Sequence, residues 1–233
     1  MGGSSSYFLT CAIRGRHVST DQETLDQEGG AMTITNGYAT LAQEKAFLSI
    51  TDSVDDDLIE RSVESASRSI DRMANRRFYA DASASARYYR ARNGYFQIVD
   101  DISSTTGLLV DLDTAGAGTY STSVAISTGF IVDPVNAIAV GRPITQITMI
   151  GGQLLPSFIP NLRPGVRVTA RWGWPSVPTD IVEATLILAA DLYKRKDAVA
   201  GIVGLSDLGS VRMGQLGRDI GAIVRAYRRE VVG

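Results

Sequence analysis

The feature that most constrains the fold of this chain is a spacing of apolar residues that changes twice. Between residues 53 and 75 apolar side chains recur every three or four positions, which is the spacing of one helix face. From residue 87 the sequence breaks into short β-branched and aromatic runs separated by Gly, Asn, Asp and Pro. After Pro178 the helical spacing returns. We therefore predict an α+β fold, in which a bundle framework of three to four helices is interrupted by an all-β insertion module.

These changes of pattern divide the chain into five predicted segments. The β-module should contain roughly six strands, and the chain should end in an extended arm with a short helix. The segments are a flexible N-terminal extension (1–31), an N-terminal helical part (32–86), the β-module (87–172), a core helix that completes the helical part (173–205) and a C-terminal docking arm with its helix (206–233).

The first two helices carry distinct signals. Thr40 and Gln43 form a capping box, so a short helix should begin here with Leu41, Phe47 and Leu48 on one side. Acidic residues then open a longer helix, where the helix dipole favours them. Its apolar stripe consists of Leu58, Ile59, Val63, Ala66, Ile70 and Met73. Its opposite, charged face is interpreted as a solvated or subunit-facing surface and consists of Glu60, Arg61, Glu64, Arg68, Asp71 and Arg72.

The stretch "RWGWPSVPTD" contains both tryptophans of the chain, Trp172 and Trp174. A strand must end here and turn sharply into a helix, for which the glycine gives backbone freedom while Pro175 and Pro178 restrict it. We expect the tryptophans to lie between the β-module and the helices. The alternative is an exposed aromatic platform that stacks a base or a sugar.

The distribution of chemically reactive residues limits the possible enzymes. Cys11 and His17 are the only Cys and His, so residues 32–233 hold no Cys/His zinc site and no Ser-His-Asp triad. A catalyst would have to use carboxylates, and Asp101, Asp111 and Asp113 are the candidates. We interpret them as solvated strand ends, and we expect the adjacent Asp100 and Asp101 to point to opposite faces.

The run "DLDTAGAG" lacks two ligands of a calcium loop and predicts a hairpin turn instead. No metal or cofactor is expected.

The charge balance of the chain is close to neutral. With 23 basic and 25 acidic residues, no whole-molecule field would attract the protein to DNA or to an anionic membrane. No apolar run reaches the roughly 18 residues that span a bilayer. The main local imbalance is a basic tail, Arg212, Arg218, Arg225, Arg228 and Arg229. Within it we predict a helix with Ile220, Ile223, Val224 and Tyr227 facing inward and Arg225, Arg228 and Arg229 facing outward. The tail could be an ordinary polar helix face, a docking segment for a partner protein or a DNA contact.

Three stretches taken together resemble the head-to-tail connector, or adaptor, family of long-tailed double-stranded DNA bacteriophages. They are "YATLAQEKAFLSITDSVDDDLIERSVESASRSIDRMANRRF" (38–78), "RVTARWGWPSVPTDIVEATLILAADLYKRKDAVAG" (167–201) and "LGSVRMGQLGRDIGAIVRAYRR" (208–229). The β-module matches mainly in "VDDISSTTGLLVDLD" and "GRPITQI". The order and spacing of these stretches carry the resemblance. Residues 1–31 match nothing in the family.

The resemblance implies a structural virion protein rather than an enzyme. It implies a ring of twelve copies beneath the portal, located in the virion neck and assembled in the host cytoplasm. The ring would join the portal to stopper or tail-completion proteins, with phage DNA passing through its lumen without sequence-specific binding. Alternatives are another neck protein, such as a stopper or tail-completion protein, and a carboxylate-dependent enzyme.

The resemblance also implies roles for individual residues. The arm would insert between portal subunits through Arg212, Arg218, Ile223, Arg225, Tyr227, Arg228 and Arg229. The charged face from Glu60 to Arg72 would set the register between identical copies. Trp172, Trp174, Pro175 and Pro178 would hold the β-module rigidly on the helices.

Overall fold

The computed structural model describes residues 34–157, 163–197 and 220–229. The chain divides by its internal contacts into two units, Met1–Ala31 and Met32–Gly233, and every described residue belongs to the second. The predicted N-terminal extension therefore lies outside the described residues, as does most of the predicted C-terminal arm.

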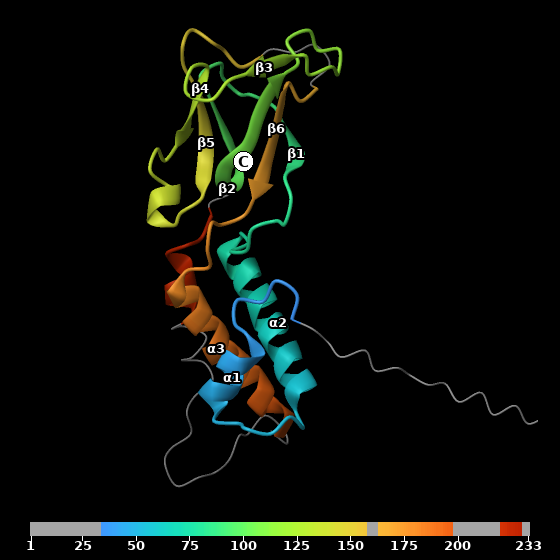
Figure 1. Cartoon of the computed structure of the whole chain (residues 1–233), viewed down its shortest axis with the longest axis vertical. Coiled ribbons are helices and arrows are strands. Elements are labelled where there is room, and N and C mark those ends of the chain that lie inside the picture. Colours follow the sequence, from blue (N-terminus) through green and yellow to red (C-terminus); the bar gives the residue numbers. More distant parts are fainter. Residues whose placement is uncertain (1–33, 158–162, 198–219, 230–233) are drawn as a thin grey trace, which may run out of the picture. The chain divides into compact units, whose positions relative to one another are not determined.

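The predicted α+β class is confirmed. Three α-helices lie side by side (Figure 1): α1 (Leu41–Leu48), α2 (Asp56–Ala74) and α3 (Thr179–Lys194). Two short 3₁₀ turns, η1 (Ile138–Val140) and η3 (Arg195–Asp197), follow β4 and α3, and residues 220–225 are also helical. The predicted capping box is present, because the Gln43 backbone N–H donates to Thr40 Oγ1 and the Thr40 backbone N–H donates to Gln43 Oε1.

The packing between α2 and α3 follows the apolar spacing of both sequences. Ile59, Val63, Ala66 and Ile70 of α2 are buried, as expected. The last buried residue of this apolar stripe is Ala74 rather than the predicted Met73, which is exposed. α3 begins directly after Pro178 and buries six residues against its neighbours: Ile181, Ala184, Thr185, Leu186, Ala189 and Ala190. The helical core therefore joins two elements that are far apart in the sequence.

The side of α1 that carries Leu41, Phe47 and Leu48 is not its buried side. Phe47 is 46% exposed, and the buried residue of α1 is Glu44. Neither carboxylate oxygen of Glu44 has a hydrogen-bond partner. Burial raises the pKa of Glu44 to about 7, and the nearby Lys194 only partly opposes this. A carboxyl group in this position is destabilising once it ionises.

Replacing Glu44 with Gln should therefore stabilise the protein in a pH-dependent way. The folded-state pKa lies above the unfolded value of 4.5, so the wild type loses stability as pH rises from about 4.5 to 7. Glu44→Gln should match the wild type near pH 4 and exceed it by about 2 to 3 kcal/mol at pH 8.5. Urea unfolding at both pH values measures this difference. Equal gains at both values would show that ionisation of Glu44 is not the cause.

The strands form one antiparallel sheet of six among the described residues, in agreement with the predicted number. Its order is β1-β6-β2-β5-β4, and β3 pairs with the end of β2. The strands are β1 (Ser85–Tyr89), β2 (Phe96–Leu112), β3 (Thr122–Val124), β4 (Phe130–Asp133), β5 (Ile144–Met149) and β6 (Val166–Trp172). The β-rich run that begins at Ala86 divides between β1 and β2, and the run that begins at Gly107 continues β2, so the strand boundaries differ from those that the turn residues indicate.

Strand β2 is the centre of the sheet. Its first half pairs with β5 and its second half with β6 and β3, with register shifts between Ile98 and Leu109 and a positive φ at Gly107. The core residues of this part come from the strands themselves and their loops, including Val99, Ile102, Ile147 and Trp172. The sheet and its loops therefore form a core separate from that of the helices.

The turn after β2 confirms the predicted hairpin. The Asp113 carboxylate accepts hydrogen bonds from the backbone N–H groups of Ala117 and Gly118, at 3.2 and 2.7 Å. Gly116 and Gly118 have positive φ. Asp113 is thus used to close a turn.

Candidate functional site

The candidate site is the joint where the chain passes between the helices and the sheet. One connection follows α2 and the other follows β6, and backbone hydrogen bonds tie them to each other and to β2. The Asp81 N–H donates to the Trp172 carbonyl, and the Gly173 N–H donates to the Asp101 carbonyl, both at 2.7 Å. Arg171 Nε donates to the Asp81 carbonyl at 2.7 Å. The two connections therefore form one bonded unit.

The two tryptophans enter different cores. Trp172 is buried among the strands, and its Nε1–H donates to the Ser85 carbonyl at 2.8 Å. Trp174 is buried in the helical core, where its ring lies 5.1 Å from Phe78 and 5.6 Å from Tyr227. Because both rings are buried, they do not form an exposed stacking platform.

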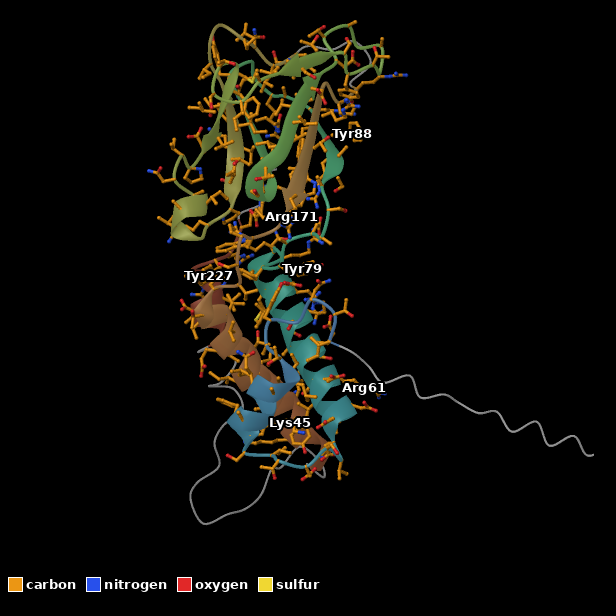
Figure 2. The ribbon with its side chains drawn as sticks, viewed as in Figure 1. Lys45, Arg61, Tyr79, Tyr88, Arg171 and Tyr227 are labelled. Carbon is orange, nitrogen blue, oxygen red and sulfur yellow. The ribbon has the colours of Figure 1, made fainter. Side chains whose placement is uncertain are left out.

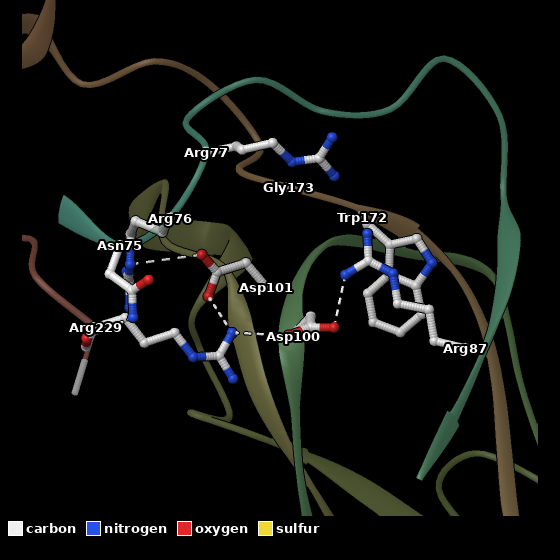
Figure 3. Close-up of a pocket in the computed structure, with 9 residues that line it drawn as sticks. All are labelled: Asn75, Arg76, Arg77, Arg87, Asp100, Asp101, Trp172, Gly173 and Arg229. Carbon is white, nitrogen blue, oxygen red and sulfur yellow. Dashed lines mark hydrogen bonds and ion pairs between the residues drawn. The ribbon is translucent and has the colours of Figure 1, made fainter. Parts of the chain in front are cut away.

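A cavity of about 140 Å³ lies at the joint (Figure 3). Asp101 lies between Arg76 and Arg229, at 3.6 and 3.7 Å, and Trp174 Nε1 donates to its second oxygen at 3.2 Å. Asp100 pairs with Arg87 at 2.7 Å and with Arg229 at 3.3 Å. Arg87 in turn covers the ring of Trp172 at 4.3 Å. One continuous ionic network therefore connects the residues that follow α2 with β1, β2 and the C-terminal segment (220–229).

Burial and charge act against each other in this network. Burial raises the pKa of Asp101, and the positive charges of Arg76 and Arg229 only partly oppose it. Burial also lowers the pKa of Arg76, which the charge of Asp101 counteracts. At Asp100 burial again favours the neutral acid, but the hydrogen bond and charge of Arg87 outweigh it, so the pKa of Asp100 is lowered. Removing one member would leave a buried charge without compensation.

The interpretation of the aspartates as solvated strand ends was wrong. Asp101, Asp111 and Asp113 are all buried. Asp111 binds Arg167 at 2.9 Å and accepts a hydrogen bond from Ser123. Asp100 and Asp101 also share a partner, Arg229, because β2 is irregular where they lie.

The three candidate catalytic carboxylates do not converge. Asp101 lines the joint cavity, whereas Asp111 and Asp113 do not. Within the ranges that the structure describes, no group of three or more His, Cys, Asp or Glu residues could hold a metal ion. The same ranges contain no helix long and apolar enough to cross a membrane.

The C-terminal segment is docked on the same chain. Ile220 and Val224 are buried and Ile223 and Tyr227 are half-buried, as predicted, while Tyr227 donates to Asp180 at 2.9 Å. Arg225 and Arg228 are exposed.

The prediction that Arg229 faces outward was wrong. Its guanidinium donates to the Val99 carbonyl at 2.7 Å, and its backbone N–H donates to the Ala74 carbonyl at 2.9 Å. The half-buried Asp100 and the buried Asp101 thus draw this arginine inward. Arg212 and Arg218 lie outside the described residues.

The charged face of α2 is partly used within the chain. Arg68 pairs with Asp71 at 3.2 Å and Glu64 at 3.7 Å, donates to the Asn36 carbonyl and lies over the ring of Tyr38. Tyr38 donates to Asp71. The remaining members are less engaged: Arg61 and Arg72 are exposed, Glu60 is half-buried, and Figure 2 shows Arg61 pointing away from the helix.

The two prolines that follow Trp174 have different positions. Pro175 is half-buried just after Trp174, and Pro178 is the N-cap residue of α3. The rigid ring of Pro178 therefore fixes where the helix begins.

Comparisons with known proteins place this arrangement among solved structures. No protein-family model and no curated protein sequence matches the chain. A chain in the structure "Neck of native GTA particle computed with C12 symmetry" is 18% identical, with a TM-score of 0.50, over 87% of this chain and 96% of that chain. The protein shares its fold with a chain of a particle neck. Because the match covers 87% of this chain, the shared neck-chain fold includes both the helices and the sheet.

Two further structures cover the same shares of both chains. "Neck of empty GTA particle computed with C6 symmetry" matches at 18% identity with a TM-score of 0.49. "Virion of native gene transfer agent (GTA) particle" matches at 16% identity with a TM-score of 0.49.

Proposed function

We propose that this protein is a structural neck protein of a phage-like virion, and specifically the head-to-tail adaptor. The observation that carries the proposal is the fold shared with a chain of the native GTA particle neck, which was computed with C12 symmetry. Twelve-fold symmetry equals the copy number that the sequence resemblance implies. In this role the protein forms a ring beneath the portal, joins it to the stopper or tail-completion proteins and lets DNA pass through the lumen. The role requires no catalyst.

The joint suits a ring member that carries mechanical load. Trp172 anchors in the sheet and Trp174 in the helical core, and the ionic network around Asp101 links the two. Force applied to the β-module would therefore pass directly to the helices.

The contacts between copies in the ring would use the free part of the α2 face. Arg68 and Asp71 already have partners within the chain, so we assign register between copies to Glu60, Arg61 and Arg72. Oppositely charged pairs between identical subunits would then fix the rotation from one copy to the next.

Portal docking would use the exposed arginines of the C-terminal segment. Tyr227 and Arg229 bind within the chain and hold the segment in place, while Arg225 and Arg228 remain exposed for a partner. Ile223, Arg212 and Arg218 complete the proposed docking set. Arginine is favoured at such positions because its planar fork binds carboxylates in pairs of hydrogen bonds.

Mass photometry of the protein with and without its portal tests this proposal. The wild type should join the portal as a ring, and the double variant Arg225→Glu with Arg228→Glu should bind at least about tenfold more weakly. Arg90→Glu with Arg163→Glu is the matched control, since these exposed arginines lie in the β-module. The control should bind the portal like the wild type.

Two results would overturn the proposal. A chain that stays monomeric and ignores the portal would contradict the adaptor role. A chain that binds other neck proteins but not the portal would instead be a stopper or tail-completion protein.

A further inference from the structure

A second hollow lies between the loop that follows β4 and the C-terminal segment. It shares Arg76 with the joint cavity, and its other lining residues are different. Its volume is about 300 Å³. Pro134, Pro143, Trp174 and Tyr227 contribute apolar walls. We call this hollow the Pro-Trp groove.

The charge lining the Pro-Trp groove is predominantly positive. Arg142 and Arg228 line it and are exposed, and within the described ranges neither has an ion-pair partner. The carboxylate of the lining, Asp180, already accepts a hydrogen bond from Tyr227. Burial and the neighbouring Asp180 raise the pKa of the Tyr227 phenol, and the charge of the nearby Arg142 partly opposes them. Two arginines without an ion-pair partner among the described residues therefore line the groove, together with Arg76, which pairs with Asp101.

Exposed apolar side chains extend the groove along the same loop. Val135 is 68% exposed and Val140 is 67% exposed, and Ile138 between them is also exposed. Apolar side chains gathered at the rim of a charged groove are typical of a protein interaction site rather than of ordinary surface.

We propose that the Pro-Trp groove binds a segment of a partner protein in which carboxylate side chains alternate with apolar ones. The two arginines would bind the carboxylates, and the prolines, Trp174 and the exposed valines would cover the apolar side chains. Nucleic acid is the poorer fit, because a phosphate backbone has no apolar groups to cover these walls. The groove is formed by one chain alone, so its existence does not depend on the adaptor role. The proposal rests on that role only for the identity of the partner.

Binding of a fluorescein-labelled peptide, Asp-Leu-Asp-Leu with blocked ends, tests the groove on the full chain. Fluorescence anisotropy should show saturable binding that quenches the emission of Trp174 and weakens as salt is raised. Arg142→Ala should weaken binding at least about fivefold. Arg90→Ala, which removes an exposed arginine of the β-module, should leave it unchanged. The peptide Asn-Leu-Asn-Leu should bind at least about fivefold more weakly than the acidic one.

Three outcomes would overturn the proposal: equal binding of the two peptides, no effect of Arg142→Ala, or stronger binding of a 20-base-pair DNA duplex that displaces the acidic peptide. Portal association of Arg142→Ala separates this inference from the proposed function. Arg228 lines the groove and also belongs to the proposed portal-docking set, whereas Arg142 lines the groove only. An Arg142→Ala variant that loses the peptide but keeps the portal therefore supports both proposals. If the wild type binds the acidic peptide but does not bind the portal, only the adaptor role is contradicted.

Discussion

Gly173→Ala is expected to lower the free energy of unfolding by at least about 4 kcal/mol, which is the largest effect of any single methyl group that we predict. Gly173 has a φ of 113°, a conformation that L-residues rarely adopt. A Cβ at this position would lie 1.9 Å from the Tyr79 carbonyl oxygen and 2.8 Å from Ala80 Cα, both backbone atoms. The clash would separate the two connections and break the bond from the Gly173 N–H to the Asp101 carbonyl.

Urea unfolding followed by circular dichroism measures this effect, and Gly107→Ala is the matched control. Gly107 also has a positive φ, but no other atom lies within 4 Å of the place that a methyl group would take there. Its replacement should cost only the backbone strain, about 1 kcal/mol. Equal losses in the two variants would show that the contact with Tyr79 does not constrain the joint.

Trp174→Ala is expected to lower the free energy of unfolding by about 3 to 5 kcal/mol. The change removes ring contacts with Phe78 and Tyr227 and the hydrogen bond to Asp101. It also uncovers the guanidinium of Arg76, which lies 5.4 Å from the ring. Trp174→Phe keeps most of the apolar contact and should cost about 1 to 3 kcal/mol, mainly from the lost hydrogen bond.

Hydrogen exchange locates the effect of the Trp174 variant. Because Tyr227 packs on Trp174, the Trp174→Ala change should reduce the amide protection of residues 223–227 more than that of the sheet residues. Thermal unfolding gives the overall loss of stability. An unchanged melting temperature, or a protection loss spread evenly over the chain, would contradict the role of Trp174 at the joint.

Features set by neighbouring residues could be predicted from the sequence. The capping box at Thr40, the apolar stripe of α2, the helix start after Pro178 and the Asp113 turn each depend on side chains within a few positions. The six-strand module also followed from local punctuation by turn residues. Strand boundaries were harder to place, since β2 continues through Gly107 and pairs with different strands on either side.

Features set by distant residues could not be predicted. Arg229 turns inward because Asp100 and Asp101, more than a hundred positions away, provide its partners. Glu44 is buried because α1 packs against both α2 and α3, although the spacing of apolar residues in this helix gathers Leu41, Phe47 and Leu48 on one side. The sequence signal available for the joint was the Trp-Gly-Trp-Pro corner, which indicated a constrained turn but not its ionic partners.

The position of the sheet between α2 and α3 has a consequence for how the chain is made. α2 ends at Ala74, and α3, its main packing partner, begins at Thr179. At typical rates of synthesis the ribosome needs roughly 5 to 20 seconds to produce the intervening segment. In that interval the apolar stripe of the nascent α2 has no α3 to pack against, while the strands β1 to β6 emerge and can pair. The sheet is therefore positioned to fold first, and the helices pack together afterwards, once α3 has emerged.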